Sequence, residues 1–133
     1  MISLNLEENV LVIQSLESII PQIEQAADIL ISTLCSGGMV AFCGNGGSAA
    51  DCQHLAGELV GRFQHERPAW RALALTADTS VLTAIGNDYG FERVFARQVE
   101  ALLGSKDTLM ILSTSGSSPN CLLAATAART QGS

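Results

Sequence analysis

Apolar residues recur along the first 36 positions with the spacing of helices. From Leu4 to Ile20 the chain has no Gly or Pro, and its apolar positions follow a mostly helical pattern. Pro21 suits the first turn of a second helix, with Ser18 as a candidate N-cap, and Gly37-Gly38 is expected to end it. The two helices predict an N-terminal helical hairpin. Its apolar surface exceeds what one small sheet can cover, so we expect it to pack against another subunit.

After residue 36, short apolar runs alternate with longer helical runs. The runs at 39–42, 71–76 and 107–112 have the length and residue types of buried strands. Helices are expected over residues 49–60, from an Ala77-Asp78-Thr79 cap to Ile85, over residues 91–103, and from Pro119 to Ala128, with a turn over residues 86–90. This alternation predicts an α/β fold of three layers, α/β/α and flavodoxin-like, in which helices cover both faces of a parallel sheet.

Length and composition fit one domain with a real core. The chain has 133 residues, of which 47% are hydrophobic and 15% charged, which argues against disorder. We expect a single domain over residues 1–133, with residues 1–36 used in oligomerisation and residues 37–133 forming the α/β core. An open α/β sheet normally continues after its last helix, so we expect this sequence to be a fragment that lacks the C-terminal part of the core.

Charge and cysteine usage narrow the classes of function. No apolar run approaches the ~20 residues of a membrane span, and the N-terminus lacks the basic residues of a signal peptide. The net charge is −6 and the seven basic residues form no run, so neither a membrane nor a nucleic-acid partner is expected. Cys35, Cys43, Cys52 and Cys121 form no C-x-x-C pair, which predicts free thiols, a cytoplasmic location and no cysteine zinc site.

The stretch CGNGGSAA, residues 43–50, is a glycine turn between a predicted strand and a predicted helix. Such a turn gathers backbone N–H groups and a helix N-terminus around one point, which favours an anion, usually a phosphate. Gly44, Gly46 and Gly47 allow positive φ angles and close approach of a ligand, and Ser48 can cap the helix and donate its hydroxyl. The stretch matches neither a Walker loop nor G-x-G-x-x-G, so no nucleotide cofactor is expected. A plain strand-to-helix turn is the alternative.

A second polar loop, STSGSS at residues 113–118, follows the third predicted strand and precedes Pro119. Neutral hydroxyls and backbone donors at a helix N-terminus can bind a phosphate monoester without a lysine. The ligand of a parallel sheet lies outside the carboxyl ends of its strands, so we expect the two loops to meet across one crevice. A solvated Ser/Gly loop is the alternative.

Three polar residues four positions apart, His54, Glu58 and Arg62, form one stripe of the predicted helix after the glycine turn. The His54–Glu58 spacing suits a shared metal ion or a base held by its neighbour; a surface pair is the alternative. Glu58 could remove a proton next to a carbonyl, and Arg62 could hold a substrate oxygen or simply pair with Glu58. Asp88, in the expected turn, suits substrate hydroxyls or proton transfer, or bonds to its own backbone.

Taken together, these motifs resemble the bacterial phosphoheptose isomerases, a family of sugar isomerase (SIS) domain proteins. The resemblance rests on the two loops, on QHLAGELVGRF at residues 53–63, on Arg67-Pro68, and on AIGNDYGF at residues 84–91. It covers almost the whole chain with several motifs in order, so it is specific at the level of the family, and it implies the SIS version of the α/β/α fold.

The resemblance implies a homotetramer that interconverts sedoheptulose 7-phosphate and D-glycero-D-manno-heptose 7-phosphate, the first step toward ADP-heptose for lipopolysaccharide. It implies Glu58 and His54 as catalytic residues, and the same two as metal ligands in the members that bind zinc. It implies a sugar-phosphate site made by Asn45, Gly46, Gly47, Ser48, Arg62, Asp88, Ser113, Thr114, Ser115 and Ser118. The family's second catalytic residue comes from a region beyond Ser133, so we expect these 133 residues alone to be weakly active.

Two alternatives without isomerase chemistry share the same fold. One is a DnaA-binding replication initiator protein, and the other is a regulatory SIS domain that senses a sugar phosphate. Glu58 and the complete Gly46-Gly47-Ser48 turn argue against the first. An isomerase assay separates the enzyme from both alternatives, and a pull-down with DnaA separates the two binding proteins from each other.

Overall fold

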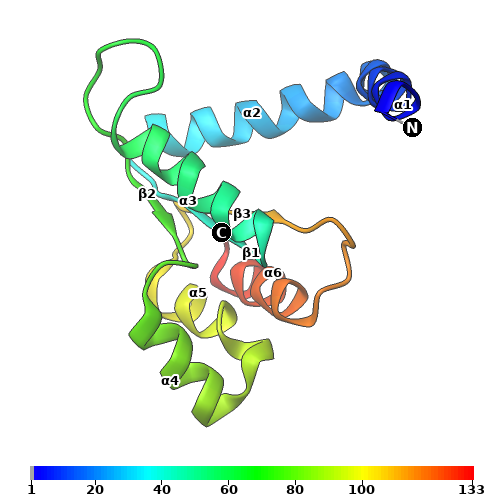
Figure 1. Cartoon of the computed structure of the whole chain (residues 1–133). Helices are drawn as coiled ribbons and strands as arrows, with labels where there is room; N and C mark the ends of the chain where they lie inside the picture. Colours follow the sequence, from blue (N-terminus) through cyan, green and yellow to red (C-terminus); the bar gives the residue numbers. More distant parts are fainter. Residues whose placement is uncertain (1) are drawn as a thin grey trace. The chain divides into compact units, whose positions relative to one another are not determined.

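The computed structural model describes residues 2–133, with side chains from Asn5 onward, so Leu4 lies outside the described side chains. The chain consists of two compact units, one ending at Ile31 and one from Ser32 to Ser133. Figure 1 shows the elements in chain order. None of the helices in the described part of the chain is long and apolar enough to cross a membrane.

The first unit holds the first of the two predicted N-terminal helices and most of the second. Helix α1 spans Ile2–Ser15 and helix α2 spans Ile20–Cys35, joined by a short 3-10 helix, η1, at Leu16–Ile19. Pro21 lies in the first turn of α2 as predicted, but Ser18 is no N-cap, because its hydroxyl donates to the Ser15 carbonyl at 2.8 Å. The connection is therefore helical rather than capped.

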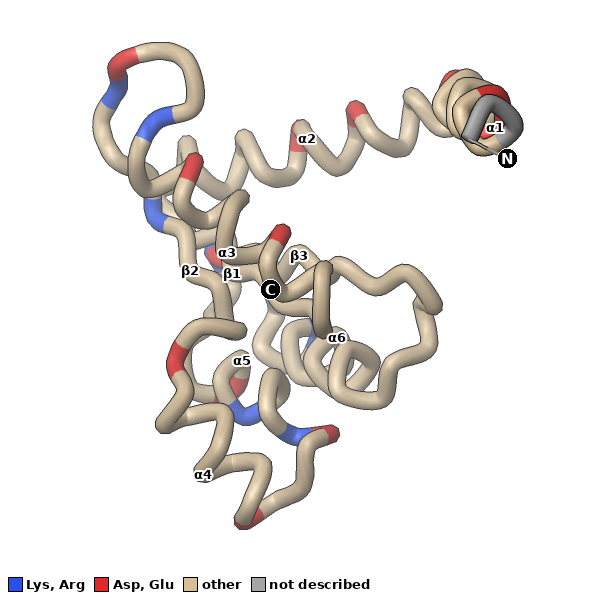
Figure 2. The backbone as a smooth tube through the Cα atoms, in the orientation of Figure 1, with Lys and Arg blue, Asp and Glu red and all other residues tan. Residues whose placement is uncertain are grey.

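The described side chains of this unit are almost entirely exposed. None from Asn5 to Ile31 is buried. Its exposed large apolar residues are Leu6, Val10, Leu11, Val12, Ile13, Leu16, Ile19, Ile20, Ile23, Ile29 and Ile31. The sequence holds no Lys or Arg before Arg62, so α1 and α2 carry only acidic charge (Figure 2). These helices present many exposed apolar side chains, and their use in oligomerisation stays a prediction.

The second unit is built on a parallel three-stranded sheet of order β2-β1-β3. Strand β1 spans Val40–Gly44, β2 spans Ala72–Ala74 and β3 spans Thr108–Leu112. The three predicted strands are confirmed with small shifts at their ends. Strand β1 lies in the centre and is buried along its whole length, which explains its uninterrupted run of apolar and small residues.

Helices cover both faces of this sheet, as predicted. Helix α3 spans Gly47–Val60, α4 Thr79–Tyr89, the 3-10 helix η2 Phe91–Arg93, α5 Ala96–Leu102 and α6 Pro119–Gln131. Figure 1 shows α3 on one side of the strands and α5 and α6 on the other. On the α5/α6 side, Ala41 and Cys43 of β1 pack in one buried cluster with residues such as Val99 and Ala124.

Two boundaries between residues 86 and 103 differ from the prediction. The expected turn over residues 86–90 is wrong, because α4 continues through Asp88 to Tyr89 and stops only where Gly90 has φ +89°. The single helix expected over residues 91–103 is divided into η2 and α5. Phe91 and Leu102, near the two ends of this range, are 63% and 48% exposed. One Gly in a helix costs only ~1 kcal/mol, so packing overrides the turn pattern.

Candidate functional site

The two predicted loops begin side by side at the carboxyl ends of adjacent strands. Gly44, the last residue of β1, is the register partner of Leu112, the last residue of β3. A Cβ atom on Gly44 would lie 2.7 Å from the Leu112 carbonyl oxygen and 3.0 Å from the Ser48 Cβ. Only glycine fits that space, so the strand ends and the first turn of α3 approach closely. The glycine loop (residues 44–48) and the serine loop (residues 113–118) thus begin at neighbouring strand ends. The expectation that they meet across one crevice stays a prediction.

The glycine loop differs in detail from its sequence interpretation. Gly46 alone of its three glycines has a positive φ, +57°, and it is the N-cap of α3. Gly47 already belongs to the helix, and Gly44 is required for close packing rather than for its backbone angle. The sequence predicted Ser48 as the cap of this helix, and that prediction is wrong, because Ser48 is the second residue of α3. Its half-buried hydroxyl lies in the first turn, where backbone N–H groups have no intrahelical partner.

Three hydroxyl groups converge in the serine loop. The Ser118 Oγ lies 3.5 Å from the Oγ of Ser113 and 3.5 Å from that of Ser115. The Gly116 N–H donates to the Ser113 Oγ at 3.2 Å, and the Ser117 N–H donates to the Ser115 Oγ at 3.2 Å. Ser118 is the N-cap of α6, and within the described residues its side chain makes no capping bond. The loop thus offers several small donors at a helix N-terminus, with Thr114 exposed beside them.

An asparagine that sequence reasoning missed connects the two loops. The Asn45 side chain, in the glycine loop, exchanges two hydrogen bonds with Asn120 in the first turn of α6. Asn120 is buried, and the one signal for it in the sequence is a polar residue directly after Pro119. The Asn45 amide is thus engaged with Asn120, and its part in substrate binding stays a prediction.

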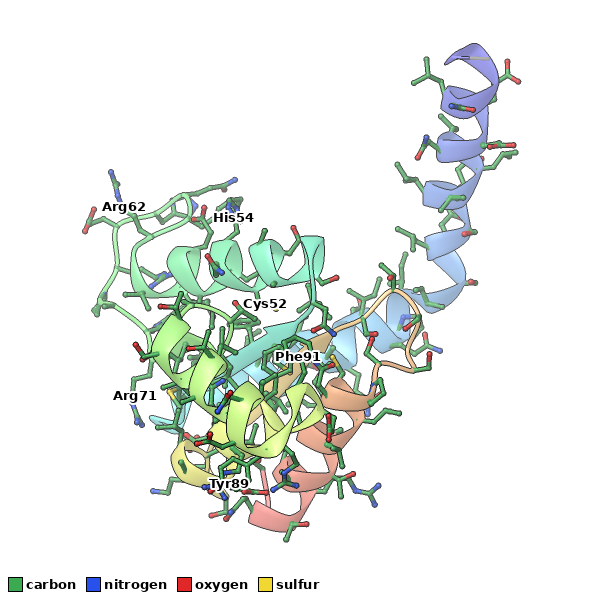
Figure 3. All side chains as sticks on the ribbon, turned by 60° about the horizontal axis from the view of Figure 1, so that its bottom comes forward. Cys52, His54, Arg62, Arg71, Tyr89 and Phe91 are labelled. Atoms are coloured by element: carbon green, nitrogen blue, oxygen red, sulfur yellow. The ribbon has the colours of Figure 1, made fainter. Side chains whose placement is uncertain are left out.

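The predicted His54–Glu58 pair forms on α3. The His54 Nε2 lies 3.5 Å from the Glu58 Oε1, and the two side chains are 72% and 31% exposed. Figure 3 shows His54 on the outer side of α3 and Cys52 beneath the helix, in agreement with their exposure. The Glu58 carboxylate is thus accessible from solvent and has an imidazole beside it.

Arg62 does not extend this pair into a stripe. Helix α3 ends at Val60, and Gly61 turns the chain away with ψ −114°. Arg62 lies in the following loop (Figure 3), where its Nη1 is 3.2 Å from the Glu66 Oε2, and both side chains are largely exposed. The expectation of three residues on one helix face is wrong because α3 ends two residues before Arg62. The Glu58–Arg62 surface pair that was the alternative is replaced by Arg62–Glu66.

Arg67, which the sequence marked only through the Arg67-Pro68 pair, closes the loop after α3. Its guanidinium donates to the backbone carbonyls of Glu58 at 2.7 Å and Leu59 at 2.9 Å. It also lies 3.8 Å from the centre of the Trp70 ring. A cation at a helix C-terminus satisfies carbonyls that have no intrahelical partner. Arg67 therefore fixes the backbone of the residue that carries the candidate carboxylate.

Asp88 lies in the last turn of α4 and is exposed. The Asn87 Nδ2 donates to its carboxylate at 2.7 Å, so it pairs with a neighbouring side chain rather than with its own backbone. Among residues 5–133, no hydrogen bond joins Asp88 to either loop. Its part in substrate binding stays a prediction.

Metal binding can be judged from the available ligands. His54 and Glu58 are close enough to share an ion, but no group of three or more potential ligands occurs among the described residues. Protein zinc sites use three or four side chains. The described residues do not by themselves complete a zinc site, so no chemical step below passes through a metal.

The layer beneath the loops is apolar and contains three buried cysteines. Cys43, Cys52 and Cys121 are free thiols, as is the exposed Cys35, in agreement with the prediction. Burial raises the pKa of Cys52 to about 11 and raises the pKa values of Cys43 and Cys121. These thiols stay protonated and uncharged at neutral pH, so the floor of the site adds no negative charge that would repel an anion.

Comparison with known proteins gives one consistent result. The model of the SIS domain family matches residues 7–133. The chain is 60% identical over 110 residues to a phosphoheptose isomerase of Solidesulfovibrio magneticus, covering 83% of this chain and 54% of that protein. It is 57% identical over 119 residues to one of Akkermansia muciniphila, covering 90% and 63%. The chain thus spans between about half and two thirds of the length of these relatives.

Solved structures agree with the sequences. Phosphoheptose isomerase GmhA from Neisseria gonorrhoeae superposes with a TM-score of 0.91 at 43% identity, covering 98% of this chain and 68% of that one. A phosphoheptose isomerase from Francisella tularensis gives a TM-score of 0.87 at 39% identity, covering 98% and 70%. These values bear out the predicted fold.

Proposed function

We propose that this chain is part of an aldose–ketose isomerase. The chain belongs to the SIS domain family, and its similarity to the phosphoheptose isomerases indicates this activity. Its substrates would be sedoheptulose 7-phosphate and D-glycero-D-manno-heptose 7-phosphate. The observation that carries the proposal is the convergence of the Ser113, Ser115 and Ser118 hydroxyls at the start of α6, directly beside the glycine loop.

The phosphate group of the substrate would bind between the two loops. Ser113, Ser115 and Ser118 would donate hydroxyl hydrogen bonds from one side, and Ser48 with the first N–H groups of α3 from the other. Hydrogen bonds to a charged oxygen are roughly twice as strong as neutral ones, and two helix N-termini favour an anion without a lysine. Asn45, Gly46, Gly47 and the exposed Thr114, Arg62 and Asp88 complete the proposed substrate site.

Glu58 would supply the chemistry. Aldose–ketose exchange moves a proton between two adjacent carbons. A base removes it from the hydroxyl-bearing carbon next to the carbonyl, leaving an enediolate; the proton returns to the former carbonyl carbon, while a second proton passes from the hydroxyl oxygen to the former carbonyl oxygen. Glu58 is the carboxylate paired with His54 on the helix that begins at the glycine loop, ten residues beyond Ser48 and so about 15 Å along the axis. His54, 3.5 Å away, would orient the carboxylate.

A zinc ion is a further part of the proposal. His54 and Glu58 would supply two of its ligands, and other ligands would have to come from outside the described residues. When bound, zinc could polarise a substrate oxygen. Elemental analysis of the purified protein, with His54→Ala as the matched variant, would measure the metal directly.

The N-terminal unit would join copies of the chain into a homotetramer. Its exposed apolar residues favour burial, and its lack of Lys and Arg means that contacts between these units would rest on apolar packing. Such a tetramer would act in the cytoplasm, at the entry to ADP-heptose and lipopolysaccharide synthesis. Light scattering that finds a stable monomer at micromolar concentration would contradict this assembly.

The experiment that tests the function is direct conversion. Purified protein is incubated with sedoheptulose 7-phosphate and the heptose product is followed by NMR, with Glu58→Gln as the test variant and Glu66→Gln as an exposed control. Conversion that requires Glu58 but not Glu66 supports the proposal. Tight sugar-phosphate binding without conversion, by the chain and by its longer natural form, would favour the regulatory sensor instead. The names of the relatives favour the enzyme over the replication partner.

A further inference from the structure

A pair of hydrogen-bonded asparagine side chains links the glycine loop to the helix that follows the serine loop. Asn45 is the first residue after β1 and Asn120 is the second residue of α6, 75 positions later. The Asn45 Nδ2 donates to the Asn120 Oδ1 at 2.9 Å, and the Asn120 Nδ2 donates to the Asn45 Oδ1 at 2.8 Å. The Asn120 Oδ1 also accepts the Cys121 backbone N–H at 3.0 Å.

This arrangement leaves the amides little freedom. Asn120 is only 3% exposed, and a buried amide that loses its partners costs more than a hydrogen bond normally contributes. Each amide nitrogen donates to the oxygen of the other amide, and the Asn45 Nδ2 also lies 3.7 Å from the Cys121 Sγ. The third bond, to the Cys121 N–H, ties the Asn120 side chain to the start of α6 itself.

The asparagine pair lies just beyond the end of the β1–β3 pairing, where the two loops begin. Sheet pairing between β1 and β3 ends at Gly44 and Leu112, and each chain then enters its own loop. Beyond the end of the sheet, the asparagine pair joins the two segments again. It links Asn45 in the glycine loop to Asn120 in α6, the helix whose N-cap residue is Ser118. It therefore sets the separation between the donors of the glycine loop and those of the serine loop.

We propose that Asn120 is a positioning residue for phosphate-monoester binding, acting through Asn45 to hold the two loops at the spacing at which one phosphate contacts both. The inference rests on the proposed function, because it assumes that this site binds a phosphate group. A site held in its bound geometry before the ligand arrives avoids the ordering cost of binding. Asn120 touches no reacting atom, and its effect falls on binding.

The test uses the whole chain and two probes, inorganic phosphate and sedoheptulose 7-phosphate, titrated by calorimetry well below the Tm of every variant. Asn120→Ser removes both hydrogen bonds to Asn45, because the serine side chain is too short to reach it, yet it leaves a polar residue in the first turn of α6. Its Kd for both probes is expected to rise about tenfold, the loss expected for one to two hydrogen bonds. Gln131→Ala, which removes an exposed side-chain amide from the same helix, is expected to leave both Kd values unchanged.

A double-mutant cycle separates positioning from general damage to the fold. If Asn120 acts through Asn45, Asn120→Ser adds less than twofold to the Kd in an Asn45→Ala background, and where turnover is measurable its effect appears in KM rather than kcat. An unchanged Kd in Asn120→Ser, or a full tenfold loss in the Asn45→Ala background, overturns the inference while the proposed function stands. A wild-type chain that binds neither probe overturns both. If Asn120→Ser does not fold, Asn120→Asp, which keeps both acceptor bonds, is held to the same cycle.

Discussion

Replacing Arg67 by alanine is expected to destabilise the second unit far more than its position in a surface loop suggests. The guanidinium donates to three backbone carbonyls, those of Glu58, Leu59 and Pro68, at 2.7 to 3.0 Å, and it stacks on Trp70 at 3.8 Å. Hydrogen bonds to charged groups contribute ~1.5–3 kcal/mol each when buried. Arg67 is half-buried, so solvent screening reduces the sum, and we expect a total loss of about 2 kcal/mol.

Urea unfolding followed by circular dichroism measures this loss, and Arg62→Ala is the matched control. Arg62 lies in the same loop, but its partner Glu66 is 84% exposed, so its removal should cost less than about 0.5 kcal/mol. For Arg67→Ala the Tm should fall by about 5 to 10 °C. Arg67→Lys, which keeps the charge and loses the planar fork, should recover less than half of the stability. Equal stability of the Arg67→Ala and Arg62→Ala variants would refute this assignment of Arg67.

Three further outcomes are expected. A Ser113→Ala/Ser115→Ala double variant should weaken sugar-phosphate binding by ~1–2 kcal/mol per charge-assisted bond lost, measured by calorimetry against Ser105→Ala, and an unchanged affinity would rule out this phosphate site. Asp78→Ala should cost about 1 kcal/mol of unfolding free energy, because the Asp78 carboxylate caps α4 by accepting the Val81 N–H at 2.9 Å. Cys35 should react with a thiol reagent at pH 8 long before the other cysteines. Burial raises the pKa of Cys52 in the folded state to about 11, above its unfolded value near 8.5. The free energy of unfolding should therefore be constant below about pH 8.5 and should fall as the pH rises from there to about 11. Four equally reactive thiols, or stability constant across that range, would contradict the buried cluster.

Much of the fold followed from the sequence because local and tertiary signals agreed. The strand at residues 40–44 is apolar along its whole length because it lies in the centre of the sheet, and Asp78 and Pro119 begin helices as their chemistry predicts. The turn signal at Gly86 failed because packing of α4 overrode a cluster of turn-forming residues. The prediction that Ser48 is the cap is wrong because Gly46, with its positive φ, takes that position two residues earlier.

The site was predicted as far as its chemistry lies in motifs. Each loop is a continuous stretch of sequence, and His54 and Glu58 are four positions apart, so these features can be predicted from spacing. Asn120 and Arg67 act on partners 75 and 9 positions away, and such contacts leave no local pattern. The stripe through Arg62 failed for the opposite reason, since a regular spacing was extended past the glycine that ends the helix.

Solvent deuterium exchange tests the central claim most directly, because it reports the proton-removal step itself. The chain is incubated with sedoheptulose 7-phosphate in D2O, and NMR follows deuterium at the carbon next to the carbonyl. We expect incorporation by the wild-type chain, and incorporation slower by roughly 10² to 10⁴-fold in Glu58→Gln, which keeps the size and hydrogen bonds of the side chain but cannot act as a base. A heptose product without deuterium, no exchange in a wild-type chain that binds the sugar phosphate, or equal exchange in Glu58→Gln would contradict the account.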